Sequence, residues 1–376
     1  MKNLVYFLGV WYNQTRKLLG GILMPKSIGE IDKNFALTPK IQREGMKFYS
    51  IDHAPFRIYG VFREGDRYRR MPEKVAKSVS DGLYNLHANT AGGRVRFRTD
   101  STRVCLVATM DHIYKFPHCA LSGVAGFDMY EKENTGYRFI ATFVPPYDLT
   151  TEYECMVSVG AKELRDLTIN FPLYSDVKEL LIGIDEDAVL LAGEEYKNDL
   201  PMVYYGSSIT QGGCASRPGT CYQGHICRRF DLDYVNLGFS GSAHGEDEMI
   251  DYLRDLPMSV FVQDYDHNSP NARHLRETGE KMYRAVRKTH PYIPIILMNR
   301  PKRFLTEEEQ ERKQEVTAIY EIARAEGDTN VYLLTDDELT AMAGDEGTVD
   351  GCHPTDLGFA SMAKALGDLL ATVCEK

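Results

Sequence analysis

Apolar runs alternate with longer amphipathic stretches through the second half of the chain. The runs have the length and the apolar content of buried strands, and they lie at 201–205, 293–298 and 331–334. The amphipathic stretches have helical spacing, and they cover 246–256, 272–290, 306–326 and 355–373. This alternation predicts a parallel sheet with helices on both faces. We therefore expect a three-layer α/β/α domain over residues 198–376.

The preceding 150 residues have a different pattern. Short segments rich in β-branched and aromatic residues follow one another there, separated by turn residues, which favours an all-β sandwich or jelly roll over residues 46–197. The polar stretch 193–199 is expected to link the two domains, and residues 1–45 to form an N-terminal extension. The predicted strands are 94–98, 104–109, 126–130, 137–143, 153–159, 167–171 and 177–184.

Two short motifs contain candidate catalytic residues. The apolar run 201–205 ends in Gly206, which permits a sharp turn, so that Ser207 and Ser208 project from the carboxyl end of a strand. Near the C-terminus, Asp350 and His353 place a carboxylate and an imidazole three residues apart. A hydroxyl, an imidazole and a carboxylate are the components of a serine hydrolase.

Two better-known motifs do not fit the first segment. Thr210 occupies the position of the second glycine in a Gly-x-Ser-x-Gly elbow, so the segment differs from that of α/β-hydrolases. The lysine of a phosphate-binding loop is also missing.

Taken in order, the motifs resemble the sequence blocks of the SGNH, or GDSL, hydrolase superfamily. Gly206-Ser-Ser208 is similar to the Gly-Asp-Ser block, with Ser207 in place of the usual aspartate. Gly241 follows an apolar run as in the second block, and Asn268 matches the asparagine of the third, although Asp266 replaces its common glycine. The pair Asp350 and His353 fits the last block.

This resemblance implies a role for each matched residue. Ser208 would be the nucleophile, His353 its general base, and Asp350 the group that orients the imidazole. The N–H groups of Ser208 and Gly241 and the amide of Asn268 would form the oxyanion hole. The neighbours Tyr265, Asp266 and His267 are expected to bind substrate or brace the third-block loop.

A β-sandwich ahead of such a domain resembles the arrangement of two-domain carbohydrate esterases. The resemblance implies removal of a small acyl group, most simply acetyl, from a saccharide or related metabolite. The single tryptophan is Trp11, so tyrosines would have to replace tryptophan in stacking on a sugar. A lipase, thioesterase or acyltransferase using the same triad, and a non-catalytic carbohydrate-binding protein, remain alternatives.

Net charge and cysteine spacing reduce the range of partners and cofactors that we expect. The net charge of −10, spread along 376 residues, disfavours a nucleic-acid partner, which requires clustered Lys and Arg. Eight cysteines include no Cys-x-x-Cys pair, so we interpret Cys214, Cys221 and Cys227 as core filling rather than metal ligands. Cys352 lies beside the candidate triad, but Ser208 fits the nucleophile block better. We expect no cofactor and no metal.

The N-terminal apolar run bears on localisation. Residues 4–12 are too few to span a bilayer, and no small-residue cleavage site follows them. We therefore expect a cytoplasmic protein without a membrane partner, with secretion as the alternative. The oligomeric state is left open by the sequence.

Overall fold

The structure is a computed structural model that describes residues 44–374. The apolar run 4–12, Trp11 and nearly all of the expected extension 1–45 lie outside the described residues. Within 44–374, no helix has both the length and the apolar character needed to cross a membrane.

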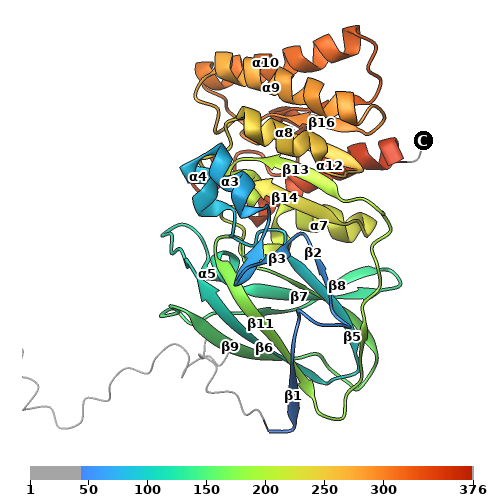
Figure 1. Cartoon of the computed structure of the whole chain (residues 1–376). Coiled ribbons are helices and arrows are strands. Elements are labelled where there is room, and N and C mark those ends of the chain that lie inside the picture. The colour runs from blue at the N-terminus through green and yellow to red at the C-terminus, as the bar shows by residue number, and fades with distance from the viewer. Residues whose placement is uncertain (1–43, 375–376) are drawn as a thin grey trace, which may run out of the picture. The chain divides into compact units, whose positions relative to one another are not determined.

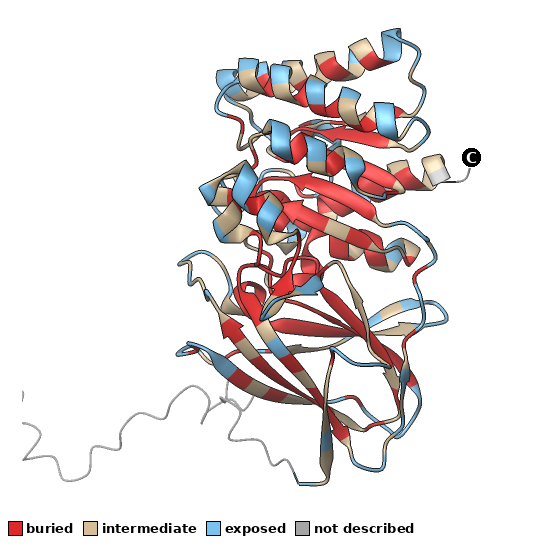
Figure 2. Cartoon of the chain, in the orientation of Figure 1, coloured by how far each residue is buried: buried red, intermediate tan, exposed pale blue. Residues whose placement is uncertain are grey.

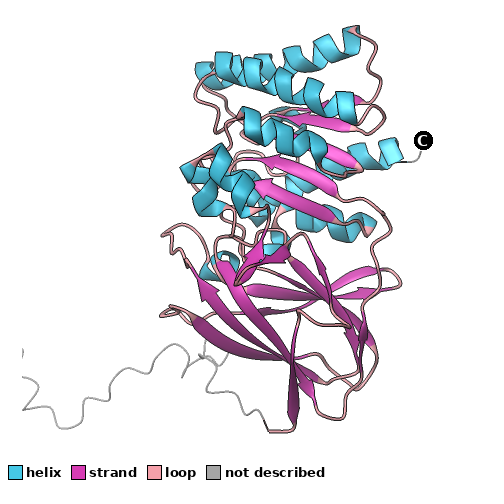
Figure 3. Cartoon of the chain, viewed as in Figure 1, coloured by secondary structure: helices cyan, strands magenta, loops and turns pink. Residues whose placement is uncertain are grey.

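Two antiparallel sheets form the strand-rich part, as predicted (Figures 1 and 3). Their inward side chains meet in one core that includes Phe97, Leu106 and Leu167. The first sheet has the order β1 (Met46–Ser50), β11 (Asp176–Asp185), β6 (Arg103–Asp111) and β9 (Glu152–Ser158). The second has the order β12 (Leu190–Ala192), β5 (Arg94–Thr99), β10 (Arg165–Asn170), β7 (Phe127–Glu133) and β8 (Gly136–Phe143), with β2 (Arg57–Tyr59) also on β5. A separate hairpin joins β3 (Phe62–Glu64) and β4 (Arg67–Arg69).

Several short elements were not predicted from the sequence. Helices α3 (Glu73–Val79) and α4 (Asp81–Leu86) interrupt the strand-rich part, and Ser80 between them caps α4 by accepting a hydrogen bond from the N–H of Leu83 at 3.2 Å. The two helices have seven and six residues, too few for a clear helical period. Also missed were α5 (Leu121–Val124) and α7 (Tyr222–Phe230).

The α/β part has one five-stranded sheet in which every pairing is parallel. Its order is β14 (Tyr234–Gly238), β13 (Met202–Gly206), β15 (Val260–Asp264), β16 (Ile295–Met298) and β17 (Val331–Leu334). This order reverses direction next to β13, and ligands bind at such a switch point in open α/β sheets. The helices are α6 (Ser208–Gln211), α8 (Asp247–Asp255), α9 (Ala272–Thr289), α10 (Glu307–Ala325), α11 (Asp336–Leu339) and α12 (Asp356–Cys374).

Side-chain alternation along β13 builds two cores. Val203 and Tyr205 pack into a core with residues of α8, α9 and α10. Met202 and Tyr204 point to the opposite face, where α7 and α12 supply the partners. Figure 2 shows the strands of this sheet buried between exposed helix surfaces.

The core that contains Met202 and Tyr204 extends into the strand-rich part. The cluster that holds Met202 and Tyr204 also contains Phe97 and Ile169 of the strand-rich part. Residues from Gln42 onward accordingly form one compact unit. A domain boundary between residues 197 and 198 therefore stays a prediction.

Arg70 links the two parts. Its fully buried guanidinium donates hydrogen bonds to the carbonyls of Gly238 at 2.6 Å, Asn236 at 3.2 Å and Leu86 at 2.8 Å, and lies 4.7 Å from the centre of the Phe239 ring. Burial lowers the pKa of Arg70 to about 9, which leaves the group charged at neutral pH. One side chain thus ties the α4 end to the carboxyl end of β14.

Replacing Arg70 should destabilise the whole unit. Arg70→Leu leaves three buried carbonyls without their charged donor, so we expect the free energy of unfolding to fall by about 2–5 kcal/mol. Arg273→Leu is the control, since Arg273 is exposed and forms an ion pair with Glu277 one helical turn away; its loss should stay within about 0.5 kcal/mol. Chemical denaturation of both variants measures the difference, and equal stabilities would contradict the role of Arg70.

Candidate active site

Ser208 begins a short helix at the carboxyl end of β13. Gly206 permits this turn because a Cβ there would lie 2.0 Å from both the carbonyl oxygen of Asp264 and Oγ1 of Thr210. Ser207 then caps α6: its Oγ accepts a hydrogen bond from the N–H of Ile209 at 3.2 Å. The expected strand, turn and projecting hydroxyl are therefore all present.

Ser208, His353 and Asp350 form a continuous hydrogen-bonded line. Oγ of Ser208 lies 2.9 Å from Nε2 of His353, and Nδ1 of His353 lies 2.8 Å from Oδ2 of Asp350. With Nδ1–H donating to the carboxylate, Nε2 is left as the acceptor for the serine proton. The structure thus brings together the three residues, separated by up to 145 positions, that the sequence motifs single out.

The Asp350 carboxylate is held in its charged form. Partial burial raises its pKa, but hydrogen bonds from the imidazole and backbone N–H of His353, and from the N–H of Cys352, outweigh that effect and lower the pKa to about 2. The carboxylate is therefore ionised at neutral pH, as orienting a histidine requires.

The predicted oxyanion donors lie in loops that are tied to each other. Gly241 has a φ of +67°, and the position its Cβ would take is open. Nδ2 of Asn268 donates to the carbonyl of Phe239 at 2.8 Å, which fixes the third-block loop to the loop that carries Gly241. Because an amide has two N–H bonds, Asn268 keeps a second donor beyond this contact.

The three predicted substrate-binding neighbours have different positions. Tyr265 is 1% exposed, packs in the core of the α8–α10 face and shares a hydrogen bond with Thr278 at 2.6 Å. Asp266 is buried in an ion pair with Arg300 at 3.1 Å. The expectation of substrate contact is therefore wrong for Tyr265, whose side chain points into the core, and the geometry gives Asp266 a bracing role.

His267 is the one of the three that contacts the loop carrying Asp350 and His353. Its Nδ1 is 3.7 Å from the sulfur of Cys352, and its buried Nε2 has no hydrogen-bond partner among residues 44–374. Burial lowers the pKa of His267 to about 4, so the ring is neutral at pH 7.

The fold places next to His353 a group of residues that the sequence did not link to one another. The ring of His118, from the loop after β6, lies 5.9 Å from the His353 ring, and Sγ of Cys119 lies 3.3 Å from Sγ of Cys214. Cys221 and Cys227 are buried, as expected of core filling, whereas Cys214 is half-buried and has a left-handed φ of 71°. Cys119 and Cys214 are 95 positions apart in the chain, so no local sequence pattern indicates that they meet.

Family comparisons agree with this geometry. Residues 199–371 match the model of the GDSL-like lipase/acylhydrolase family. Residues 46–190 match a model for the N-terminus of SGNH-hydrolase-type esterases. The chain is an SGNH-type hydrolase. No curated protein sequence matches this hydrolase.

Solved structures share the fold of the hydrolase over most of its length. A candidate GDSL-like lipase from Bacteroides ovatus has 26% identity and a TM-score of 0.79, over 88% of this chain and 98% of that one. SsfX3, a salicylyl-acyltransferase from a tetracycline biosynthetic pathway, has 17% identity and a TM-score of 0.72, with the same coverage. An acetyl xylan esterase from the rumen bacterium Butyrivibrio proteoclasticus has 13% identity and a TM-score of 0.56, over 88% and 99%.

A second carboxylate of the hydrolase lies directly beneath the Ser208 turn. Oδ2 of Asp264 accepts hydrogen bonds from Thr210 at 2.9 Å and Tyr222 at 3.0 Å. Complete burial, reinforced by the nearby charge of Asp266, raises the pKa of Asp264 to about 8 in spite of these hydrogen bonds. The carboxyl group therefore carries a proton at neutral pH.

This proton makes stability depend on pH. Between about pH 4 and pH 8 the folded hydrolase keeps a proton on Asp264 that the unfolded chain has lost, so the contribution of this group to stability falls as pH rises, by up to about 1.4 kcal/mol per pH unit. Asp264→Asn should remove that contribution, so its stability relative to wild type should improve steadily from pH 5 to pH 8. Chemical denaturation across this range measures the trend, with Asp251→Asn, an exposed position, as control. Parallel pH profiles for wild type and Asp264→Asn would contradict it.

Proposed function

We propose that this hydrolase is a serine esterase that uses Ser208, His353 and Asp350 as its triad. The observation that carries the proposal is the pair of contacts at His353: 2.9 Å from Nε2 to the Ser208 hydroxyl and 2.8 Å from Nδ1 to the Asp350 carboxylate. An imidazole held in this tautomer can take the hydroxyl proton as Ser208 attacks an ester carbonyl.

The remaining steps use groups around the same turn. In the tetrahedral intermediate, the N–H groups of Ser208 and Gly241 and the free N–H of Asn268 would stabilise the oxyanion. His353 would then return its proton to the leaving alcohol. Water activated by the same imidazole would release the acyl group from Ser208 as a carboxylic acid, which completes the hydrolysis.

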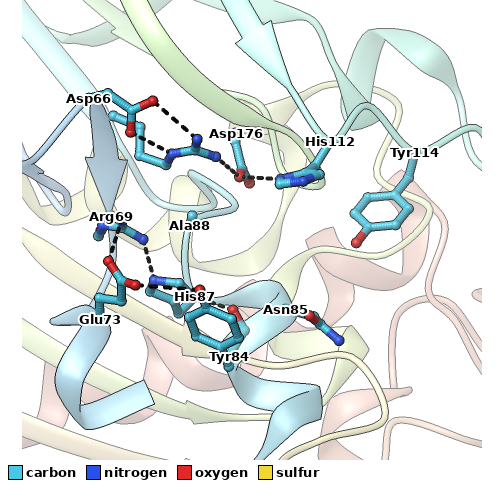
Figure 4. Close-up of a pocket in the computed structure, with 11 residues that line it drawn as sticks. Asp66, Arg69, Glu73, Tyr84, Asn85, His87, Ala88, His112, Tyr114 and Asp176 are labelled. Atoms are coloured by element: carbon cyan, nitrogen blue, oxygen red, sulfur yellow. Dashed lines mark hydrogen bonds and ion pairs between the residues drawn. The ribbon is translucent and has the colours of Figure 1, made fainter. Parts of the chain in front are cut away.

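We propose a saccharide, or a similarly hydroxylated alcohol, as the leaving group. A cavity of about 320 Å³ lies between the strand-rich part and α4, and its lining includes Arg67, Asn85, His112 and Asp176 (Figure 4). Oδ2 of Asp176 accepts from Arg67 at 3.0 Å and contacts Nδ1 of His112 at 2.8 Å. Such a density of donors and acceptors suits hydroxyl groups better than an alkyl chain.

Aromatic contacts connect this cavity to the triad. Tyr114 lines the cavity and stacks on Phe116 at 5.8 Å, and Phe116 lies 6.3 Å from the ring of His118. His118 in turn lies 5.9 Å from His353. A sugar seated in the cavity would therefore approach Ser208 along an aromatic wall, with tyrosine and phenylalanine in place of tryptophan.

The acyl group is proposed to be small, with acetyl as the simplest case. Support comes from the shared architecture with an acetyl xylan esterase and with carbohydrate esterases of family two. The likeness to a salicylyl-acyltransferase favours a second candidate, transfer of the acyl group from Ser208 to an acceptor other than water. A longer acyl chain, as in a lipase or thioesterase, is the other alternative on the same triad.

The nucleophile assignment predicts a sharp difference between adjacent serines. Ser208→Ala should lower turnover of 4-nitrophenyl acetate by about 10⁴-fold or more. Ser207→Ala removes only the helix cap, so it should cost about 1 kcal/mol of stability and keep turnover within about tenfold of wild type. Steady-state kinetics on both variants gives the comparison. Retained activity in Ser208→Ala, or equal losses in both, would rule out Ser208 as nucleophile.

The substrate proposal predicts selectivity for the alcohol and for the acyl chain. A site whose polar groups pair with hydroxyls rejects an analogue that lacks them, so kcat/KM for acetylated sugars should exceed that for simple alkyl acetates by about 10²-fold or more. Acetyl esters should also react faster than octanoyl esters.

A variant of Asn85, an exposed residue of the cavity, tests whether the sugar binds there. Asn85→Ala should lower kcat/KM for sugar acetates and leave 4-nitrophenyl acetate unchanged, because only the sugar reaches the cavity. If octanoyl esters react fastest, a lipase or thioesterase is the better assignment. If an added alcohol takes the acyl group in preference to water, an acyltransferase is the better assignment.

A further inference from the structure

Four metal-binding side chains from both parts of the chain meet beside the triad. The ligand atoms of His118, Cys214 and His353 all lie within 4.8 Å of one another. Sγ of Cys119 adds a fourth, 3.3 Å from Sγ of Cys214. His118 is exposed, so an ion can approach from solvent, while Cys214 and His353 are half-buried.

This set of donors matches the preference of one common ion. Imidazole nitrogen and cysteine sulfur are the usual ligands of Zn²⁺, whereas Mg²⁺ and Ca²⁺ prefer oxygen. In a tetrahedral zinc site with the usual bond lengths, donor atoms are about 3.3–3.8 Å apart. Separations within 4.8 Å therefore need a contraction of at most about 1.5 Å, to which side-chain rotation at exposed His118 can contribute.

We propose that His118, Cys214 and His353 bind Zn²⁺, with Cys119 as an additional sulfur ligand, and that the bound ion inhibits the hydrolase. Nδ1 of His353 is occupied by Asp350, so the ion would bind Nε2. That nitrogen is the one 2.9 Å from the Ser208 hydroxyl, and one lone pair cannot both hold zinc and accept the serine proton. The inhibition rests on the proposed role of His353 as base, while the binding does not.

The hydrogen-bond partner of His353 favours zinc binding at this site. Asp350 on the far nitrogen of His353 gives the carboxylate–histidine arrangement that orients and strengthens histidine ligands of zinc. The cysteine thiols lose their protons to solvent when the ion binds, so affinity should increase with pH.

Binding is tested first, without reference to activity. Full-length Ser208→Ala protein, kept reduced, is dialysed against buffered Zn²⁺, and one ion per chain is expected. Co²⁺ in place of zinc should give a thiolate-to-cobalt charge-transfer absorption. Adding His118→Ala or Cys214→Ser should weaken zinc binding by at least about tenfold, since even neighbours of a ligand contribute that much. No stoichiometric zinc, or unchanged affinity in both double variants, would overturn the proposal.

Inhibition is tested next on wild-type protein with 4-nitrophenyl acetate. Turnover should fall as free Zn²⁺ rises and return when a chelator is added. Relative to its own zinc-free turnover, each of His118→Ala and Cys214→Ser should need at least about tenfold more zinc for half inhibition. Cys352→Ser, a half-buried cysteine in the His353 loop, is the matched control and should behave as wild type.

The outcomes separate the two proposals. Unchanged zinc sensitivity in both ligand variants, or its loss in Cys352→Ser, would overturn the inhibitory site. If zinc binding is stoichiometric and is also weakened by adding His353→Ala, undiminished turnover of zinc-loaded wild type would keep the metal site and instead contradict His353 as the base.

Discussion

The position of Ser208 depends on two places where the backbone of the sheet tolerates no side chain. A Cβ on Gly206 would lie 2.0 Å from the carbonyl oxygen of Asp264, and a Cβ on Gly238 would lie 2.2 Å from the backbone nitrogen of Gln211. Helix α6 can therefore sit directly against the ends of β14 and β15. This close packing sets where the hydroxyl emerges, and with it the position of the Ser208 oxygen that lies 2.9 Å from Nε2 of His353.

Electrostatics at the same edge separates charged from neutral groups. Asp350 is exposed and accepts hydrogen bonds from N–H donors, so it stays ionised, whereas the fully buried Asp264 keeps its proton. His267 is neutral because of its burial. The carboxylate that contacts Nδ1 of His353 is thus ionised, while the buried Asp264 and His267 are neutral.

Periodicity in the sequence predicted the parallel sheet and most strands of the sandwich. Short motifs in a diagnostic order singled out Ser208, Asp350 and His353, which the structure brings into contact. Contacts between distant residues were not predictable. Helix α4 is too short to show a period, and the direction of the Tyr265 side chain depends on which face of its loop meets α9. The meeting of Cys119 with Cys214 depends on how a sandwich loop lies over the α/β part, which no local pattern records.

One apolar core extends from the sandwich sheets to the face of the α/β sheet that α7 and α12 cover. This shared core limits how the two parts can evolve separately. A module joined by a linker can be lost, duplicated or exchanged without harm to its neighbour. Here Phe97 and Tyr204 belong to one apolar cluster, so removing either part would expose the other's interior to water. Such a chain should unfold in a single cooperative transition, and its two parts should be inherited together rather than shuffled separately.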